Sequence, residues 1–220
     1  MDLMTLAMTS KIMGGGGSSG GDASFDDYFA GNEVHLTLPT ATKIRDYGCY
    51  RASKLKSVNM PNVTSIGSNA FYYSGITTFT APKLKTISTD AFKQCTSLVL
   101  TSLPSGITKL TGEVFNGCYN LAISSLPSGL TEIPSYAFYE CRAIKTLTIP
   151  SGVTKFGAFA FGACTGLETV TFEGTPTTMY TNNFSSCTNL TTINVPWAEG
   201  AVANAPWGAT NATINYNYKG

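Results

Sequence analysis

Residues 144–166, IKTLTIPSGVTKFGAFAFGACTG, decide the fold of this chain, because the same pattern recurs along most of its length. Each copy has spaced apolar residues, a short turn, a second apolar pair, and a phenylalanine followed three residues later by a cysteine. The cysteines of successive copies lie 23 residues apart. A period of this length indicates a solenoid, in which each unit contacts only its neighbours.

The register of the repeat predicts the core. Ser74 takes the cysteine position in the unit at 54–75, and Cys49 takes the phenylalanine position in a degenerate unit at 34–53. A single coil cannot bury its apolar side chains, so we expect stacked coils to bury them on one another. The predicted core columns are Phe71, Phe92, Phe115, Phe138, Phe161 and Phe184, with Cys95, Cys118, Cys141, Cys164 and Cys187.

Each unit is expected to combine a strand with an outer turn. Within 144–166, the residues Ile144, Leu147 and Ile149 alternate as the buried face of a strand does. Pro150 ends that strand because it has no N–H for the ladder. The spacing of Phe161 and Cys164 predicts a short helical or 3₁₀ turn on the opposite side.

The unit resembles the BspA-type leucine-rich repeat, and the resemblance covers about residues 34–195. It implies an α/β repeat solenoid of about seven to eight coils of 22–23 residues, with parallel strands on one face and helical or 3₁₀ turns on the other. It also implies kinship with bacterial surface proteins that bind host or matrix proteins, and with proteins of gut bacteria and their prophages. The family has no general catalytic residues to carry over.

Five segments are expected along the chain. Residues 1–13 form a short apolar anchor helix or a frayed leader without a role, and 14–21 form a Gly/Ser linker. Residues 22–33 form an N-terminal cap, 34–195 the solenoid, and 196–220 a C-terminal cap that contains Trp197, Trp207 and an inward-pointing Ile214. The face of the anchor helix carries Met4, Met8 and Ile12.

Composition excludes several partners. The 14 Lys and Arg residues nearly balance the 13 Asp and Glu residues, so no basic stripe for nucleic acid is expected. No apolar stretch reaches the length of a membrane span, and no signal peptide is recognisable. The 31 Thr and 20 Ser residues favour strands and turns with a neutral surface.

The outward strand positions form the candidate binding face, which is polar, uncharged and rich in hydroxyl groups. Thr101 and Ser124 occupy positions where other units place an inward apolar residue. Either the core is locally shifted there, or Leu100 and Ile123 face outward side by side. Five tyrosines near the outer turns serve recognition or cover the turns: Tyr72, Tyr73, Tyr119, Tyr136 and Tyr139. The candidate face comprises Ser57, Asn59, Thr78, Thr80, Leu100, Ile123, Thr146, Thr148, Thr169, Thr171, Thr192 and Asn194.

No catalytic, metal or cofactor site is predicted. A straight row of cysteines cannot wrap tetrahedrally around zinc, and parallel stacked side chains reach disulfide geometry poorly, so free buried thiols are expected. The single histidine, His35, has no partner in the repeat pattern. An enzyme would need a convergent acid, base or nucleophile.

The sequence therefore favours a non-enzymatic recognition or structural module. It would bind protein or glycan at a virion or cell surface, for example as a phage tail-associated protein that contacts virion components through residues 1–13. The alternative is a secreted bacterial adhesin that binds host or matrix proteins.

Overall fold

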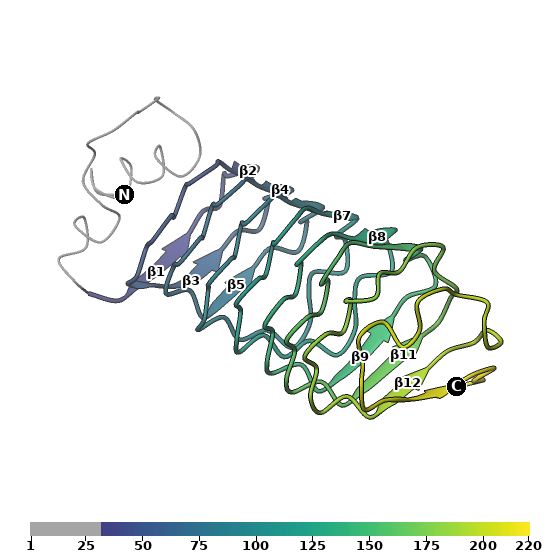
Figure 1. Ribbon diagram of the computed structural model, residues 1–220. Helices are drawn as coiled ribbons and strands as arrows, with labels where there is room; N and C mark the ends of the chain where they lie inside the picture. The colour runs from purple at the N-terminus through teal and green to yellow at the C-terminus, as the bar shows by residue number, and fades with distance from the viewer. Residues whose placement is uncertain (1–31) are drawn as a thin grey trace.

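The computed structural model describes residues 32–220, which wind into a stack of about eight coils (Figure 1). All strand pairs are parallel, so each coil adds one layer to the same rod. The predicted repeat solenoid with parallel strands is thereby confirmed. The anchor residues Met4, Met8 and Ile12, the 14–21 linker and most of the 22–33 cap lie outside the described residues.

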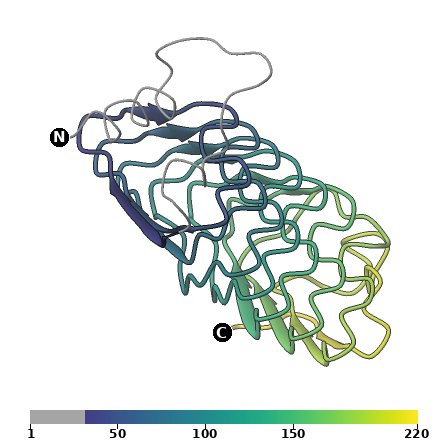
Figure 2. The same cartoon turned by 90° about the vertical axis from the view of Figure 1, so that its left-hand side faces the viewer.

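One face of the rod, here called the long-strand face, carries two sheets. The N-terminal sheet consists of β1 (Val34–Thr37), β3 (Leu55–Asn59) and β5 (Thr78–Thr80). The C-terminal sheet consists of β9 (Thr146–Ile149), β11 (Thr169–Phe172), β12 (Thr192–Asn194) and β13 (Thr213–Asn215). The two sheets lie on the same side of the rod, with a gap between β5 and β9 (Figures 1 and 2).

A second row of two-residue strands, here called the short-strand face, follows the turn in each coil. In these pairs the second residue is buried and apolar, as in Lys43–Ile44 and Lys155–Phe156. The repeat pattern predicted strands on one face only, and the structure adds this row. Its strands are β2 (Lys43–Ile44), β4 (Ser65–Ile66), β6 (Thr86–Ile87) and β7 (Lys109–Leu110) in one sheet, with β8 (Glu132–Ile133) and β10 (Lys155–Phe156) in another.

The third side, here called the turn face, corrects the predicted helical or 3₁₀ turns. Residues 32–220 contain no helix, so the α component of the predicted α/β class is wrong. Asn69 and Tyr73, which flank Phe71, have φ values of +55° and +53°, and a left-handed residue interrupts a right-handed helix. The Phe71 N–H instead donates to the Ala91 carbonyl of the next coil at 2.7 Å. The turns are therefore bonded between coils.

The core is a column of stacked rings with a column of thiols beside it. Phe71 and Phe92 stack with their centroids 5.0 Å apart and their planes 5° apart, and similar pairs continue to Phe184. Each Cys Sγ donates a hydrogen bond to a phenylalanine carbonyl one coil earlier, as from Cys95 to Phe71 at 2.8 Å. All members of both columns are buried.

The gap in the long-strand face is here called the break and comprises residues 98–103 and 121–126. Thr101 and Ser124 occupy the repeat position that Phe79 and Leu147 fill elsewhere. Both polar residues are exposed, while Ile123 is buried with 1% exposure and Leu100 is partly buried. The backbone has shifted to bury the neighbouring apolar residue, because an unpaired hydroxyl in the core is costly. The prediction that Ile123 faces outward is therefore wrong.

Two tryptophans close the C-terminal end of the core. Trp207 is fully buried, its Nε1–H donates to the Ala203 carbonyl at 2.8 Å, and its ring contacts those of Trp197 and Phe172. Ile214 of β13 is only partly buried, although it packs against the core. Trp207 is therefore more deeply buried than Ile214 at this end of the stack.

Replacing Trp207 with Ala is expected to lower the free energy of unfolding by about 3 kcal/mol, because it opens a large cavity at the end of the stack. Urea denaturation and the melting temperature measure this change. The control Tyr218→Ala removes a half-exposed ring and is expected to change stability by less than about 0.5 kcal/mol. An unchanged melting temperature in Trp207→Ala would contradict the capping role.

Replacing Ala163 with Gly is expected to stabilise the protein by about 0.5 kcal/mol. Ala163 has a φ of +55°, where a side chain is strained and glycine is not. Ala158→Gly is the matched control: it lies in the same turn without a left-handed φ, so the same change should destabilise by about 0.5–1 kcal/mol. Equal destabilisation in both variants would show that the left-handed turn carries no strain.

Candidate functional site

The long-strand face presents rows of neutral polar side chains in exact strand register. In the C-terminal sheet, Thr146, Thr169, Thr192 and Thr213 pair across the four strands. A second row runs through Thr148, Thr171, Asn194 and Asn215. The predicted outward positions on this sheet therefore lie together and form one hydroxyl-rich surface.

Asn194 is an exception among the predicted binding residues. It is only 8% exposed, its Nδ2–H donates to the Thr171 hydroxyl at 3.1 Å, and its Oδ1 accepts from Asn215 at 2.8 Å. Through these hydrogen bonds the side-chain amide of Asn194 links β11, β12 and β13. Asn194 therefore stabilises the sheet, and its assignment to the binding face is corrected.

The N-terminal sheet carries a shorter version of the same rows. His35, Ser57 and Thr78 are paired in register, as are Thr37, Asn59 and Thr80. The His35 Nδ1 lies 2.7 Å from the Ser57 hydroxyl, so the histidine belongs to a polar row on the sheet. The predicted residues Ser57, Asn59, Thr78 and Thr80 thus form a second group, and the break separates them from the C-terminal sheet.

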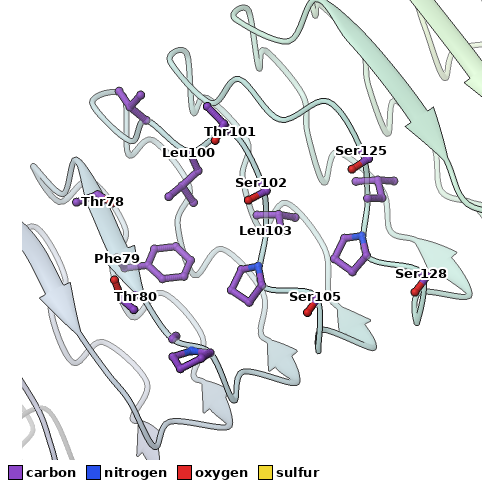
Figure 3. Close-up of a pocket in the computed structure, with 16 residues that line it drawn as sticks. Thr78, Phe79, Thr80, Leu100, Thr101, Ser102, Leu103, Ser105, Ser125 and Ser128 are labelled. Carbon is purple, nitrogen blue, oxygen red and sulfur yellow. The ribbon is translucent and has the colours of Figure 1, made fainter.

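Between the two groups lies a hollow of about 870 Å³, which Figure 3 shows in close-up. This volume falls within the range of about 300–1,000 Å³ typical of ligand pockets. The nearly buried side chains of Phe79, Leu103 and Leu126 line it, together with the partly buried Leu100. Hydroxyl groups from Thr78, Thr80, Thr101, Ser102, Ser105, Ser125 and Ser128 surround these apolar groups, and none of the lining residues is charged.

The sequence pointed to the break but missed the hollow. Leu100 is the one apolar residue of the predicted binding face that lines the hollow, whereas Phe79, Leu103 and Leu126 were assigned to no binding role. The available signal was the polar residue at the inward position, Thr101 in one coil and Ser124 in the next. Two consecutive coils with this mismatch indicate where the sheet is interrupted.

Aromatic residues gather on the turn face of the first coils. Tyr50 and Tyr72 stack with centroids 5.3 Å apart, and Arg51 lies 5.5 Å above the Tyr50 ring and 5.9 Å from that of Tyr73. Farther along, Arg142 lies 4.2 Å above Tyr119. The predicted tyrosines are thus on the turns, and several stack on neighbouring coils.

Charged side chains are also found on the turn face. Lys93 contacts Glu113 at 2.6 Å and Asp90 at 3.4 Å. The hydrogen bond from Lys93 lowers the pKa of Glu113, and burial raises that of Asp90. Lys93 links the two carboxylates, both of which lie on left-handed backbone, so the cluster serves to hold adjacent turns together.

The cysteine column is enclosed, and burial keeps four of its five thiols protonated. Burial raises the pKa of Cys95 to about 12 and also raises those of Cys118, Cys141 and Cys164, whereas a hydrogen bond with Cys164 lowers the pKa of Cys187. A thiolate is needed for nucleophilic or metal-binding chemistry. No group of three side chains suited to holding a metal ion occurs within residues 32–220. The column therefore acts as packing.

Comparison with known proteins supports the repeat assignment. The family model described as the BspA type leucine rich repeat region matches residues 21–99 and 85–201 in six copies. No curated protein matches the chain.

Two solved structures share the fold. A leucine rich cell surface protein from Faecalibacterium prausnitzii A2-165 is 23% identical with a TM-score of 0.57, and the match covers 75% of this chain and 64% of that protein. The leucine rich repeat protein of T. pallidum is 22% identical with a TM-score of 0.56, over 70% of this chain and 76% of that one. This chain therefore spans less than two thirds of the Faecalibacterium protein.

Five of the six buried cysteines, all except Cys187, are expected to resist a thiol reagent at pH 8 until the protein unfolds, because burial raises their pKa. Stability should fall as the pH rises above about 8.5, where these five thiols ionise in the unfolded chain and not in the folded one. Kinetics of reaction with a chromogenic disulfide reagent measure the first effect, and urea midpoints between pH 7 and 10 measure the second. Thr210→Cys, at an exposed position, should react at once. Rapid native labelling of more than one thiol in the wild type would contradict the packing role.

Proposed function

Because this chain belongs to the BspA-type leucine-rich repeat family, we propose that it is a non-enzymatic recognition module. It binds protein or glycan through the long-strand face, at a virion or cell surface. The observation that carries the proposal is the uncharged surface made by the hydroxyl rows and the hollow between them.

The chemistry of this face suits recognition by many weak neutral contacts. Threonine offers a donor, an acceptor and a methyl group, and its strand conformation fixes the direction of each. Rows at the spacing of parallel strands, about 4.8 Å, match an extended ligand better than a compact one. Neutral lining groups favour uncharged ligand surfaces, since a buried charge without a partner is costly.

The non-enzymatic assignment rests on the positions of the reactive residues. The ring of His35 contacts the hydroxyl group of Ser57, and the six cysteines are all buried. The charged cluster around Lys93 lies on the turn face, away from the hollow. These groups do not converge on one reacting atom, which catalysis requires.

The surface location is supported by the family and by the similarity to the Faecalibacterium protein, which is a leucine rich cell surface protein. No helix in the described part of the chain is long and apolar enough to cross a membrane. We propose a phage tail-associated protein as the specific role, with residues 1–13 as the attachment to virion components. A secreted bacterial adhesin that binds host or matrix proteins is the alternative. Co-purification of the chain with virions distinguishes them.

An array of glycans and proteins, probed with the full chain, tests the binding function. Thr171→Arg places a long charged side chain in the middle of the hydroxyl rows, and it is expected to weaken binding at least about tenfold. Thr131→Arg is the matched control because this exposed threonine precedes β8 on the short-strand face, so binding should not change.

The two variants also show how the proposal fails. If the wild-type chain bound neither a glycan nor a protein on the array, a purely structural role would be indicated. Binding that survives Thr171→Arg but is lost in Thr131→Arg would place the recognition surface on the short-strand face.

A further inference from the structure

Strand β5 has one edge that no other coil covers. Its other edge pairs with β3, where the Met60 N–H donates to the Thr80 carbonyl at 2.7 Å. In a parallel pair the N–H and C=O of one residue face the same neighbouring strand, and successive residues alternate, so the backbone groups of Thr80 face β3 and those of Phe79 face away from it. Val99 donates to the Thr77 carbonyl at 2.7 Å, but no backbone hydrogen bond then joins Thr78–Thr80 to that coil within residues 32–220.

The opposite wall also has unpaired backbone groups. In the described chain, the N–H groups of Leu100, Thr101, Ser102 and Leu103 donate no backbone hydrogen bond, although the Leu100 carbonyl accepts from Ala122 at 3.0 Å. Most backbone groups in a folded protein are hydrogen-bonded. These four N–H groups lie where other coils form the sheet, and here they are left to solvent. The residues on both sides of this gap line the hollow (Figure 3).

From this arrangement we infer that the hollow binds an extended, uncharged peptide segment of a partner protein, which adds as a strand along β5. The inference rests on the proposed binding function and names the class of ligand for the same face. Strand addition to an open edge is a general mode of peptide recognition: backbone bonds give affinity, and pockets for alternate side chains give specificity.

The lining supplies both parts of this recognition. The edge of β5 alternates N–H and C=O groups at strand spacing, which is the pattern complementary to another peptide backbone. Alternate side chains of the peptide would contact the apolar group formed by Phe79, Leu100 and Leu103. The remaining side chains would face the hydroxyls of Thr101 and Ser102. Since no lining residue is charged, a charged segment would lose its hydration without gaining a partner.

Variants at Phe79 separate recognition of a backbone from recognition of a side chain. Phe79→Pro removes the N–H that faces the hollow and keeps the bonds to β3, because proline is tolerated in an edge strand where its N–H would face solvent. Phe79→Leu is the matched control, because it also loses the ring but keeps the N–H. The probe is an array of eight-residue peptides drawn from uncharged residues, incubated with the full chain. Phe79→Pro is expected to weaken binding about tenfold or more relative to Phe79→Leu.

Two further measurements keep the test decisive if Phe79→Pro does not fold. Leu100→Arg fills the hollow from the other wall and should abolish peptide binding. Amide hydrogen exchange, followed by NMR, should slow at Phe79 and Ser102 when a bound peptide is added to the wild type.

The outcomes distinguish this inference from the broader proposal. Peptide binding as strong in a folded Phe79→Pro as in Phe79→Leu, or unaltered exchange at both amides, overturns the inference. Binding to glycans alone also overturns it and leaves the proposed recognition function standing. An absence of binding to peptides, proteins and glycans contradicts both.

Discussion

The stacking of one phenylalanine per coil is the constraint on which the rest of the structure depends. Ring centroids 5.0–5.9 Å apart nearly match the spacing of neighbouring strands, so the aromatic column and the backbone ladders fit the same rise. The thiol column beside it satisfies the phenylalanine carbonyls of the preceding coil. Because rings, thiols and ladders share one repeat, a sequence change in any coil must be absorbed without altering the rise from that coil to the next.

The break shows how two coils absorb such a change. Thr101 and Ser124 would place hydroxyls in the core if the strand continued, so the chain turns them outward and buries neighbouring apolar residues. Phe115 and Phe138 of the same coils keep their places, with centroids 5.5 Å apart. The turn face therefore holds the stack in register while the long-strand face loses its ladder. The hollow is the consequence on the surface.

Much of this fold was predictable because the repeat states the packing directly. The phase of Phe and Cys predicted the coil and the two columns, and the resemblance to the repeat family implied the parallel order of the strands. The turn geometry was not predictable, since the left-handed positions hold residues as different as Asn69, Tyr73 and Ala163, without the glycine that usually marks them. The hollow was not predictable either. A polar residue at position 101 signals a disturbance, but whether the backbone bulges, shifts or opens depends on the adjacent coils.

Regularity and recognition have opposite requirements in a solenoid. In a complete ladder every backbone group is paired with the next coil, so only side chains are left to contact a ligand. Such a face, as in the C-terminal sheet, repeats the same threonine row at each layer and offers little to distinguish one ligand position from another. Backbone donors and acceptors become available only where the ladder stops. Specificity in this chain is therefore best placed at its least regular coils, and the aromatic column makes that irregularity tolerable.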